Sequence, residues 1–116
     1  MFEIKVNQFI NEISNNDNLD EWYLSRFIDD NVRTLTTQDA FYQSNIILRK
    51  IRNDIFFNHL YELLEILIAL RMQSDTNEIP LLLIENPTIF DKIEKHRIED
   101  YILLPIRKLK KIFYLN

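Results

Sequence analysis

The two histidines, His59 and His96, are the side chains best suited to acid–base or metal chemistry in this 116-residue sequence. Glu62 follows His59 by three residues, which places both on one edge of a helix. Helical di-iron proteins, however, carry a Glu-x-x-His pair on each of two helices, and no Glu-x-x-His occurs here. We therefore interpret His59 as a histidine with local hydrogen bonds and His96, within a charged stretch, as solvated.

Neighbouring acids are the other candidates for catalysis. Three close pairs occur, Asp29–Asp30, Glu62–Glu65 and Glu99–Asp100. Carboxylate catalysis requires two acids whose environments separate their pKa values, and the sequence indicates no pocket that would do this. An enzyme would need a buried pocket in which His59, Glu62 and Glu65 converge. We predict instead that the protein is not an enzyme.

Two residue types that many active sites need are missing. The sequence contains no cysteine, which excludes disulfides, thiolate metal ligands and a cysteine nucleophile. It contains no glycine, which excludes phosphate-binding loops, dinucleotide-binding fingerprints and nucleophile elbows, because these need backbone conformations that a side chain obstructs. We therefore predict neither a cofactor nor a metal ion. The lack of cysteine also fits a reducing, cytoplasmic compartment.

The charge balance favours a basic protein as partner. The net charge is −4 and the pI is about 5.1, which disfavours binding to nucleic acid through phosphate neutralisation. Residues 1–30 contain seven acids against Lys5 and Arg26, a local balance of −5. The seven acids are Glu3, Glu12, Asp17, Asp20, Glu21, Asp29 and Asp30. An acidic surface of this kind attracts a basic partner.

Asp20 and Glu21 lie at the expected start of the second helix. Asn18 is the expected N-cap residue, with Glu21 as its reciprocal partner three residues later. Acids in the first turn of a helix also interact favourably with the helix dipole. Helix physics alone therefore explains these two acids.

Asp29 and Asp30 lie at the expected end of the same helix, where the dipole disfavours negative charge. Capping of the next segment by Asp30 is the explanation we prefer, and a patch that faces a partner is the alternative. Trp22, on the same helix, is either a core residue or an interface anchor. The predicted partner-binding residues are Asp17, Asp20, Glu21, Trp22, Asp29 and Asp30.

Four basic residues cluster near the end of the sequence: Arg107, Lys108, Lys110 and Lys111. Cations near the C-terminus of a helix interact favourably with its dipole, and we prefer this structural explanation. A patch that binds RNA, a membrane or an acidic partner is the alternative.

Hydrophobic spacing predicts the helices that position these residues. Apolar residues three and four positions apart predict one helix over residues 2–13 and another from residue 18 to about residue 30. Thr36 or Thr37 is the expected cap of a third helix. This helix would end at a turn formed by residues 53–54.

Residues 55–72 are the predicted centre of the fold. They carry two adjacent apolar stripes, and a helix that is apolar over so wide an arc is buried on most sides. The remaining strip contains Asn58, Glu62 and Glu65, which we expect to face solvent or a partner.

Prolines divide the last third of the sequence. Asn86 and Pro87 form the expected start of a short helix. Pro105 is expected either to kink one helix or to begin a final one. Residues 81–84 and 98–104 are short apolar runs, so buried strands remain an alternative to helices there.

Together these patterns predict an all-α fold, in a single compact domain spanning residues 1–116, with about five to seven helices. The packing is either an irregular bundle or a stack of helix pairs that resembles a helical repeat. Residues 48–51 and 106–109, Leu-Arg-Lys-Ile and Ile-Arg-Lys-Leu, are the only sign of a repeat. No apolar run is long enough to span a bilayer, so we predict no membrane association. The oligomeric state stays open.

A small, acidic, cysteine-free helical protein without catalytic motifs resembles the immunity proteins encoded beside bacterial polymorphic toxins, including contact-dependent growth inhibition systems. The resemblance is one of class traits over the whole chain. It implies a cytoplasmic protein that binds a cognate toxin domain, often a basic nuclease, and covers its active site or substrate groove. The alternative is a small helical adaptor or phage-type regulator that binds another protein or a nucleic acid.

Overall fold

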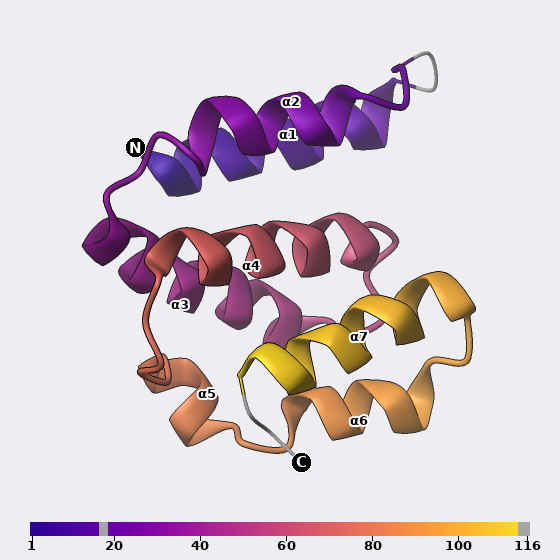
Figure 1. Cartoon of the computed structure of the whole chain (residues 1–116). Coiled ribbons are helices and arrows are strands. Elements are labelled where there is room, and N and C mark those ends of the chain that lie inside the picture. Colours follow the sequence, from indigo (N-terminus) through magenta and orange to yellow (C-terminus); the bar gives the residue numbers. More distant parts are fainter. Residues whose placement is uncertain (17–18, 114–116) are drawn as a thin grey trace.

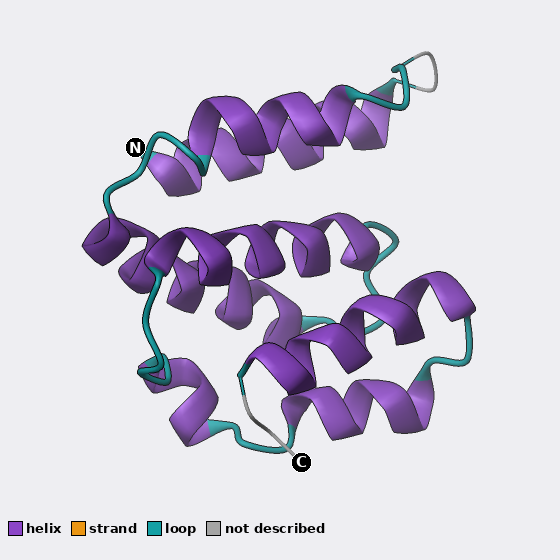
Figure 2. Ribbon diagram, viewed as in Figure 1, coloured by secondary structure: helices purple, strands orange, loops and turns teal. Residues whose placement is uncertain are grey.

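The computed structural model describes residues 1–16 and 19–113. Within these residues the chain forms seven helices and no strand (Figure 2). The helices are α1 (Phe2–Asn15), α2 (Tyr23–Asn31), α3 (Thr37–Asn53), α4 (Leu60–Ser74), α5 (Leu81–Glu85), α6 (Ile89–His96) and α7 (Asp100–Ile112). The predicted all-α fold is confirmed. The strand alternative is wrong, because residues 81–84 lie in α5 and residues 100–104 lie in α7.

Three antiparallel helix pairs, α1–α2, α3–α4 and α6–α7, are stacked one on another (Figure 1). In the first pair, the ring of Phe9 stacks on Tyr23 and Phe27, with centroid distances of 5.4 and 4.6 Å. In the third pair, Lys110 of α7 forms ion pairs with Asp91 and Glu94 of α6. The molecule measures 38 × 34 × 20 Å. Its short dimension matches two layers of helices, each about 10 Å thick.

The second helices of the last two pairs, α4 and α7, run in the same direction. Near the start of both helices, the rings of Tyr61 and Tyr101 lie 6.3 Å apart. Near their ends, the guanidinium group of Arg71 donates a hydrogen bond to the carbonyl of Ile112 at 3.4 Å. The two helices therefore lie side by side over their whole length.

The second helix of the first pair, α2, shares this direction. Tyr23 at its start lines the same hollow as Tyr61. After its end, the carbonyl of Leu35 accepts a hydrogen bond of 2.7 Å from Gln73 of α4. Parallel second helices in successive pairs are the arrangement of helical-repeat proteins, so the fold matches the predicted stack of helix pairs.

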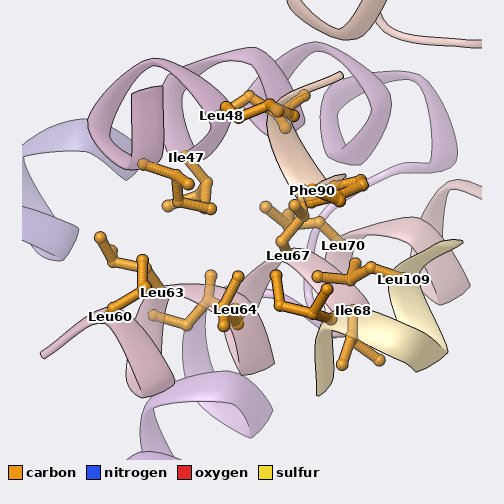
Figure 3. Packing of buried hydrophobic residues seen from close by; sticks show 14 of the residues in the cluster. Ile47, Leu48, Leu60, Leu63, Leu64, Leu67, Ile68, Leu70, Phe90 and Leu109 are labelled. Atoms are coloured by element: carbon orange, nitrogen blue, oxygen red, sulfur yellow. The ribbon is translucent and has the colours of Figure 1, made fainter. Parts of the chain in front are cut away.

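α4 is the centre of the hydrophobic core, as predicted. Its buried residues occupy all of its circumference except one strip. Figure 3 shows Leu63 and Leu67 of α4 among Ile47 of α3, Phe90 of α6 and Leu109 of α7. Leu67 is completely buried. α4 packs against α3 of its own pair and against helices of the other two pairs, so its buried side chains form the centre of the hydrophobic cluster.

α4 begins at Leu60 rather than at residue 55, so this predicted boundary is wrong. The carboxylate of Asp54 accepts a hydrogen bond of 3.0 Å from the Phe56 amide, and Arg97 donates a bond of 2.9 Å to the carbonyl of Ile55. The Phe56 amide and the Ile55 carbonyl, which would form hydrogen bonds within a longer helix, are therefore bonded to side chains instead. Phe56, assigned to the core by the sequence pattern, is 61% exposed as a result.

α2 begins at Tyr23, several residues later than predicted. The carboxylate of Asp20 accepts a hydrogen bond of 3.0 Å from the Trp22 amide, which forms a turn ahead of the helix. Glu21 lies in this turn and not in the helix, so the predicted capping box is wrong. Asn18, its predicted N-cap, lies outside the described residues.

Two predictions for the proline-rich third also change. Asn86 ends α5, and α6 begins only at Ile89, so the expected helix start at Asn86 is wrong. Pro105 lies inside α7, which continues through it, so Pro105 does not begin a separate helix. The likeness between residues 48–51 and 106–109 is not a structural repeat, because α3 is the first helix of its pair and α7 is the second.

Thr36 caps α3, as predicted. Its hydroxyl accepts a hydrogen bond of 3.1 Å from the Asp39 amide, one of the amides that a helix start leaves without a partner. This cap shows that the preferred explanation of Asp30 is wrong: α2 continues to Asn31, and Asp30 does not cap α3.

We expect Thr36→Ala to lower the free energy of unfolding by about 1 kcal/mol, because the Asp39 amide loses its acceptor. Urea denaturation followed by circular dichroism measures this loss. Thr37→Ala is the matched control, since Thr37 is the first helical residue and not the cap. Equal stability losses in the two variants would show that the Thr36 hydroxyl does not act as a cap.

Arg97 joins two segments of the chain next to the start of α7. Its guanidinium group, almost completely buried, donates to the Ile55 carbonyl at 2.9 Å and to the Glu99 carboxylate at 2.6 Å. These bonds from Arg97 are the main reason that the pKa of Glu99 falls from 4.5 to about 2. The buried guanidinium group of Arg97 thus joins the turn before α4 to the turn before α7.

Glu99→Gln is expected to remove a pH-dependent part of the stability. Because the pKa of Glu99 is lower in the folded state than in the unfolded chain, its stabilising effect is complete above pH 4.5 and disappears as the pH falls towards about 2. Urea midpoints of the original protein and the variant should therefore differ at neutral pH and converge over this interval. A difference that stays constant down to pH 2 would refute this role.

Candidate functional site

Three of the predicted partner-binding residues lie together at the turn between α1 and α2. Asp20 forms an ion pair of 3.1 Å with Arg26, whereas Glu21 and Trp22 are exposed. Trp22 is 61% exposed, so it is not a core residue. Asp17 lies outside the described residues.

Asp29 and Asp30 lie at the other end of α2, about 13 Å from this turn by the length of the helix. Asp29 forms an ion pair of 3.0 Å with Arg33, which offsets the unfavourable helix dipole. Asp30 lines a hollow between α1 and α2 together with Lys5 and Arg26. The predicted residues therefore divide into two groups at opposite ends of α2.

The group at the α1–α2 turn meets the start of α4. Asp20 and Glu21 line a hollow of about 340 Å³ together with Tyr23, His59 and Glu62. Nδ1 of His59 lies 3.2 Å from a carboxylate oxygen of Glu62, and both side chains are about three-quarters buried. The local hydrogen bond predicted for His59 is thus present.

Glu65 does not join His59 and Glu62 in this hollow. It lines a second hollow, further along α4. Burial, followed by the negative charges of Glu65 and Glu62, raises the pKa of Tyr61. The pocket in which His59, Glu62 and Glu65 would converge is therefore not formed.

Glu62 and Glu65 are the acids that helix physics explains least. They lie one turn apart on α4, where like charges disfavour the helix. Glu62 is in the first turn and benefits from the dipole, but Glu65 is beyond it. Glu65 has no ion pair within the described residues. An unfavourable arrangement that is not locally compensated is more common at functional sites than elsewhere on a protein surface.

The outer strip of α4 forms the floor of an open groove between α2 and α7, which we call the α4 groove. Its floor residues are Glu62, Glu65, Ala69 and Met72. The second hollow, of about 360 Å³, occupies its middle part and is bounded by Ile28 of α2, by Arg33 just after α2 and by Lys108 of α7. The groove is acidic at its start, where α2 and α4 begin, and further along apolar Ala69 and Met72 lie beside the charged side chains of Arg33 and Lys108.

The wall formed by α7 is partly apolar. Tyr101, Leu104 and Lys108 follow one another at helical spacing and share a face of α7. Tyr101 contacts Tyr61 at one end of the groove, and Lys108 lines its middle. Leu104 lies between them and is 65% exposed. Met72 on the floor is equally exposed. Exposed apolar residues that lie close together indicate a binding surface.

The basic cluster predicted near the end of the sequence is divided between two faces. Lys110 forms ion pairs of 2.6 Å with Asp91 and with Glu94, and these carboxylates raise its pKa. Arg107 lies 3.9 Å from Glu94. Lys108, in contrast, faces the α4 groove. Acids of α6 neutralise much of the cluster, which weakens its case as a nucleic-acid site.

Within residues 1–16 and 19–113, no three His, Asp or Glu side chains are grouped as metal ligands. None of the helices in this part of the chain is long and apolar enough to cross a membrane. Comparisons with models of protein families, with curated proteins and with solved structures found no match.

The sequence predicted the acids of the α1–α2 turn but did not group them with Glu62 and Glu65. The signal was present, since the strip containing these two glutamates was expected to face solvent or a partner. What the sequence could not indicate is the parallel arrangement of α2 and α4, which brings Glu21 and Glu62 to one hollow.

Proposed function

We propose that the protein is a non-enzymatic binding protein that neutralises a basic bacterial toxin domain, as immunity proteins do. The observation that supports this most strongly is the acidic start of the α4 groove. Glu21 and Glu62, from two different helix pairs, line one hollow there, and Glu65 follows one turn later on α4. None of the three has a lysine or arginine ion pair among the described residues. Carboxylates without an ion pair to a lysine or arginine of their own chain are available to cations of a partner.

The proposed interaction combines charge with apolar anchors. The acidic end of the groove attracts a basic domain over several ångströms and raises the association rate. Exposed Trp22, Leu104 and Met72 then supply apolar surface, which slows dissociation. In a basic nuclease, the cations that bind the phosphates of the substrate are the groups that these carboxylates attract. Binding would therefore cover the substrate-binding surface of the nuclease. Neutralisation needs no chemistry from this chain and takes place in the cytoplasm.

Coexpression tests this function. The toxin domain, sought at the variable C-terminal end of any secreted protein encoded beside this one, is expressed alone and together with this protein. We expect growth arrest with the domain alone and normal growth with both, and the two proteins should copurify. Continued arrest in cells that contain this protein at a comparable level would rule out immunity. Binding without restored growth would favour the adaptor alternative instead.

A further inference from the structure

The α4 groove has the size of a docking site for one helix. Its floor runs from Glu62 to Met72, a distance of about 15 Å at 1.5 Å per residue. Helices α2 and α7 flank this floor on both sides and run parallel to it, and each supplies apolar or charged side chains to the hollow. A helix of about three turns would cover the floor and contact both walls.

The chemistry of the groove changes along its length. The start carries the negative charges of Asp20, Glu21 and Glu62, and Glu65 follows Glu62 one turn later on α4. The middle is lined by the small side chain of Ala69, which permits a close approach by another helix, and by exposed Met72. Exposed Leu104 lies on the adjoining wall by its helical spacing between Tyr101 and Lys108. A complementary segment therefore has cations at one end and apolar residues on the same face further along.

We infer that the α4 groove binds an amphipathic helix of the partner, with two basic residues one turn apart over Glu62 and Glu65 and apolar residues over Ala69 and Leu104. This inference rests on the proposed function and specifies which part of the partner is bound. Charge selects the end of the groove at which the helix enters, and the apolar contacts hold it in place. The proposed occupant is a segment of another protein, and the test below distinguishes it from a second copy of this chain.

Synthetic peptides test the groove without the toxin. The probe is a stapled helix of about 15 residues, long enough for the floor, with two arginines one turn apart followed by leucines on the same face. One control peptide has glutamates in place of the arginines, and the other has glutamines in place of the leucines. We expect the arginine–leucine peptide to bind at least about tenfold more tightly than either control.

Two variants connect this binding to the groove. Ala69→Trp fills the floor, and Leu104→Glu places a charge on an exposed position where folding is little affected. Each should weaken binding of the arginine–leucine peptide by about tenfold or more. Leu81→Glu is the matched control, since Leu81 of α5 is also exposed, at 60%. It should leave the affinity unchanged.

Several outcomes would overturn the inference. Failure of the arginine–leucine peptide to bind, equal binding of the glutamine peptide, or unchanged affinity of Leu104→Glu would each show that no amphipathic helix occupies the groove. A dimer in sedimentation equilibrium that Leu104→Glu dissociates would make a second copy the occupant. None of these outcomes depends on toxin neutralisation, which the coexpression experiment tests separately. If coexpression restores growth but the arginine–leucine peptide does not bind, the proposed function stands and the inference about the α4 groove is wrong.

Discussion

Reversing the charge of both Glu62 and Glu65 to lysine is expected to slow association with the basic toxin domain by about 10-fold to 100-fold at low ionic strength. Electrostatic steering accelerates association by about 10-fold to 1,000-fold, and these two carboxylates are the closest pair on the proposed face. Stopped-flow fluorescence of Trp22, the single tryptophan, can measure the rate. The effect should shrink as salt is added, because exposed charges are then screened.

The matched control changes the net charge equally at other places. Glu12 lies on α1 and Glu85 on α5, and both are exposed. The variant with Glu12→Lys and Glu85→Lys should slow association much less than the variant with Glu62→Lys and Glu65→Lys. Equal rates for the two variants would mean that overall charge, and not the α4 groove, steers the partner. If reversing the charges of Asp29 and Asp30 slowed association more than reversing those of Glu62 and Glu65, the binding face would lie at the other end of α2.

Leu67→Ala is expected to lower the free energy of unfolding by about 3 to 5 kcal/mol, enough to unfold a marginally stable domain. Leu67 is completely buried in the middle of α4. Its loss leaves a cavity that rigid neighbouring helices cannot close. Urea denaturation measures the change. Leu104→Ala provides the control, because Leu104 is 65% exposed. This substitution should lower the free energy of unfolding by about 0.5 kcal/mol or less. A loss below 1 kcal/mol for Leu67→Ala would contradict the central position of α4.

The spacing of apolar residues was sufficient to predict the helices and the burial of α4, because its arc of leucines leaves only one strip for solvent. The helix boundaries were less predictable. At Asp20 and Asp54, a carboxylate bonds to the backbone amide two residues later and delays the next helix. Such turns compete with the helix on nearly equal terms, so residue type alone does not decide between them.

The candidate site was only partly predictable for a different reason. The acids themselves are visible in the sequence, and the exposed strip with Glu62 and Glu65 follows from the helical period. Their grouping with Glu21 depends on contacts between residues about forty positions apart, which the direction of α2 relative to α4 decides. Asp29 stood out in the sequence because residue type alone does not reveal its ion pair with Arg33.

The absence of cysteine allows a direct test of which face binds the toxin domain. Single cysteines are introduced by Glu65→Cys and Leu104→Cys in the groove, and by Glu12→Cys and Glu85→Cys elsewhere, and the rate of thiol modification is measured with and without the partner. Strong protection of the two groove positions, with unchanged rates at Glu12→Cys and Glu85→Cys, is the predicted result. Equal modification of the groove cysteines in the free protein and in the complex would contradict binding at the α4 groove.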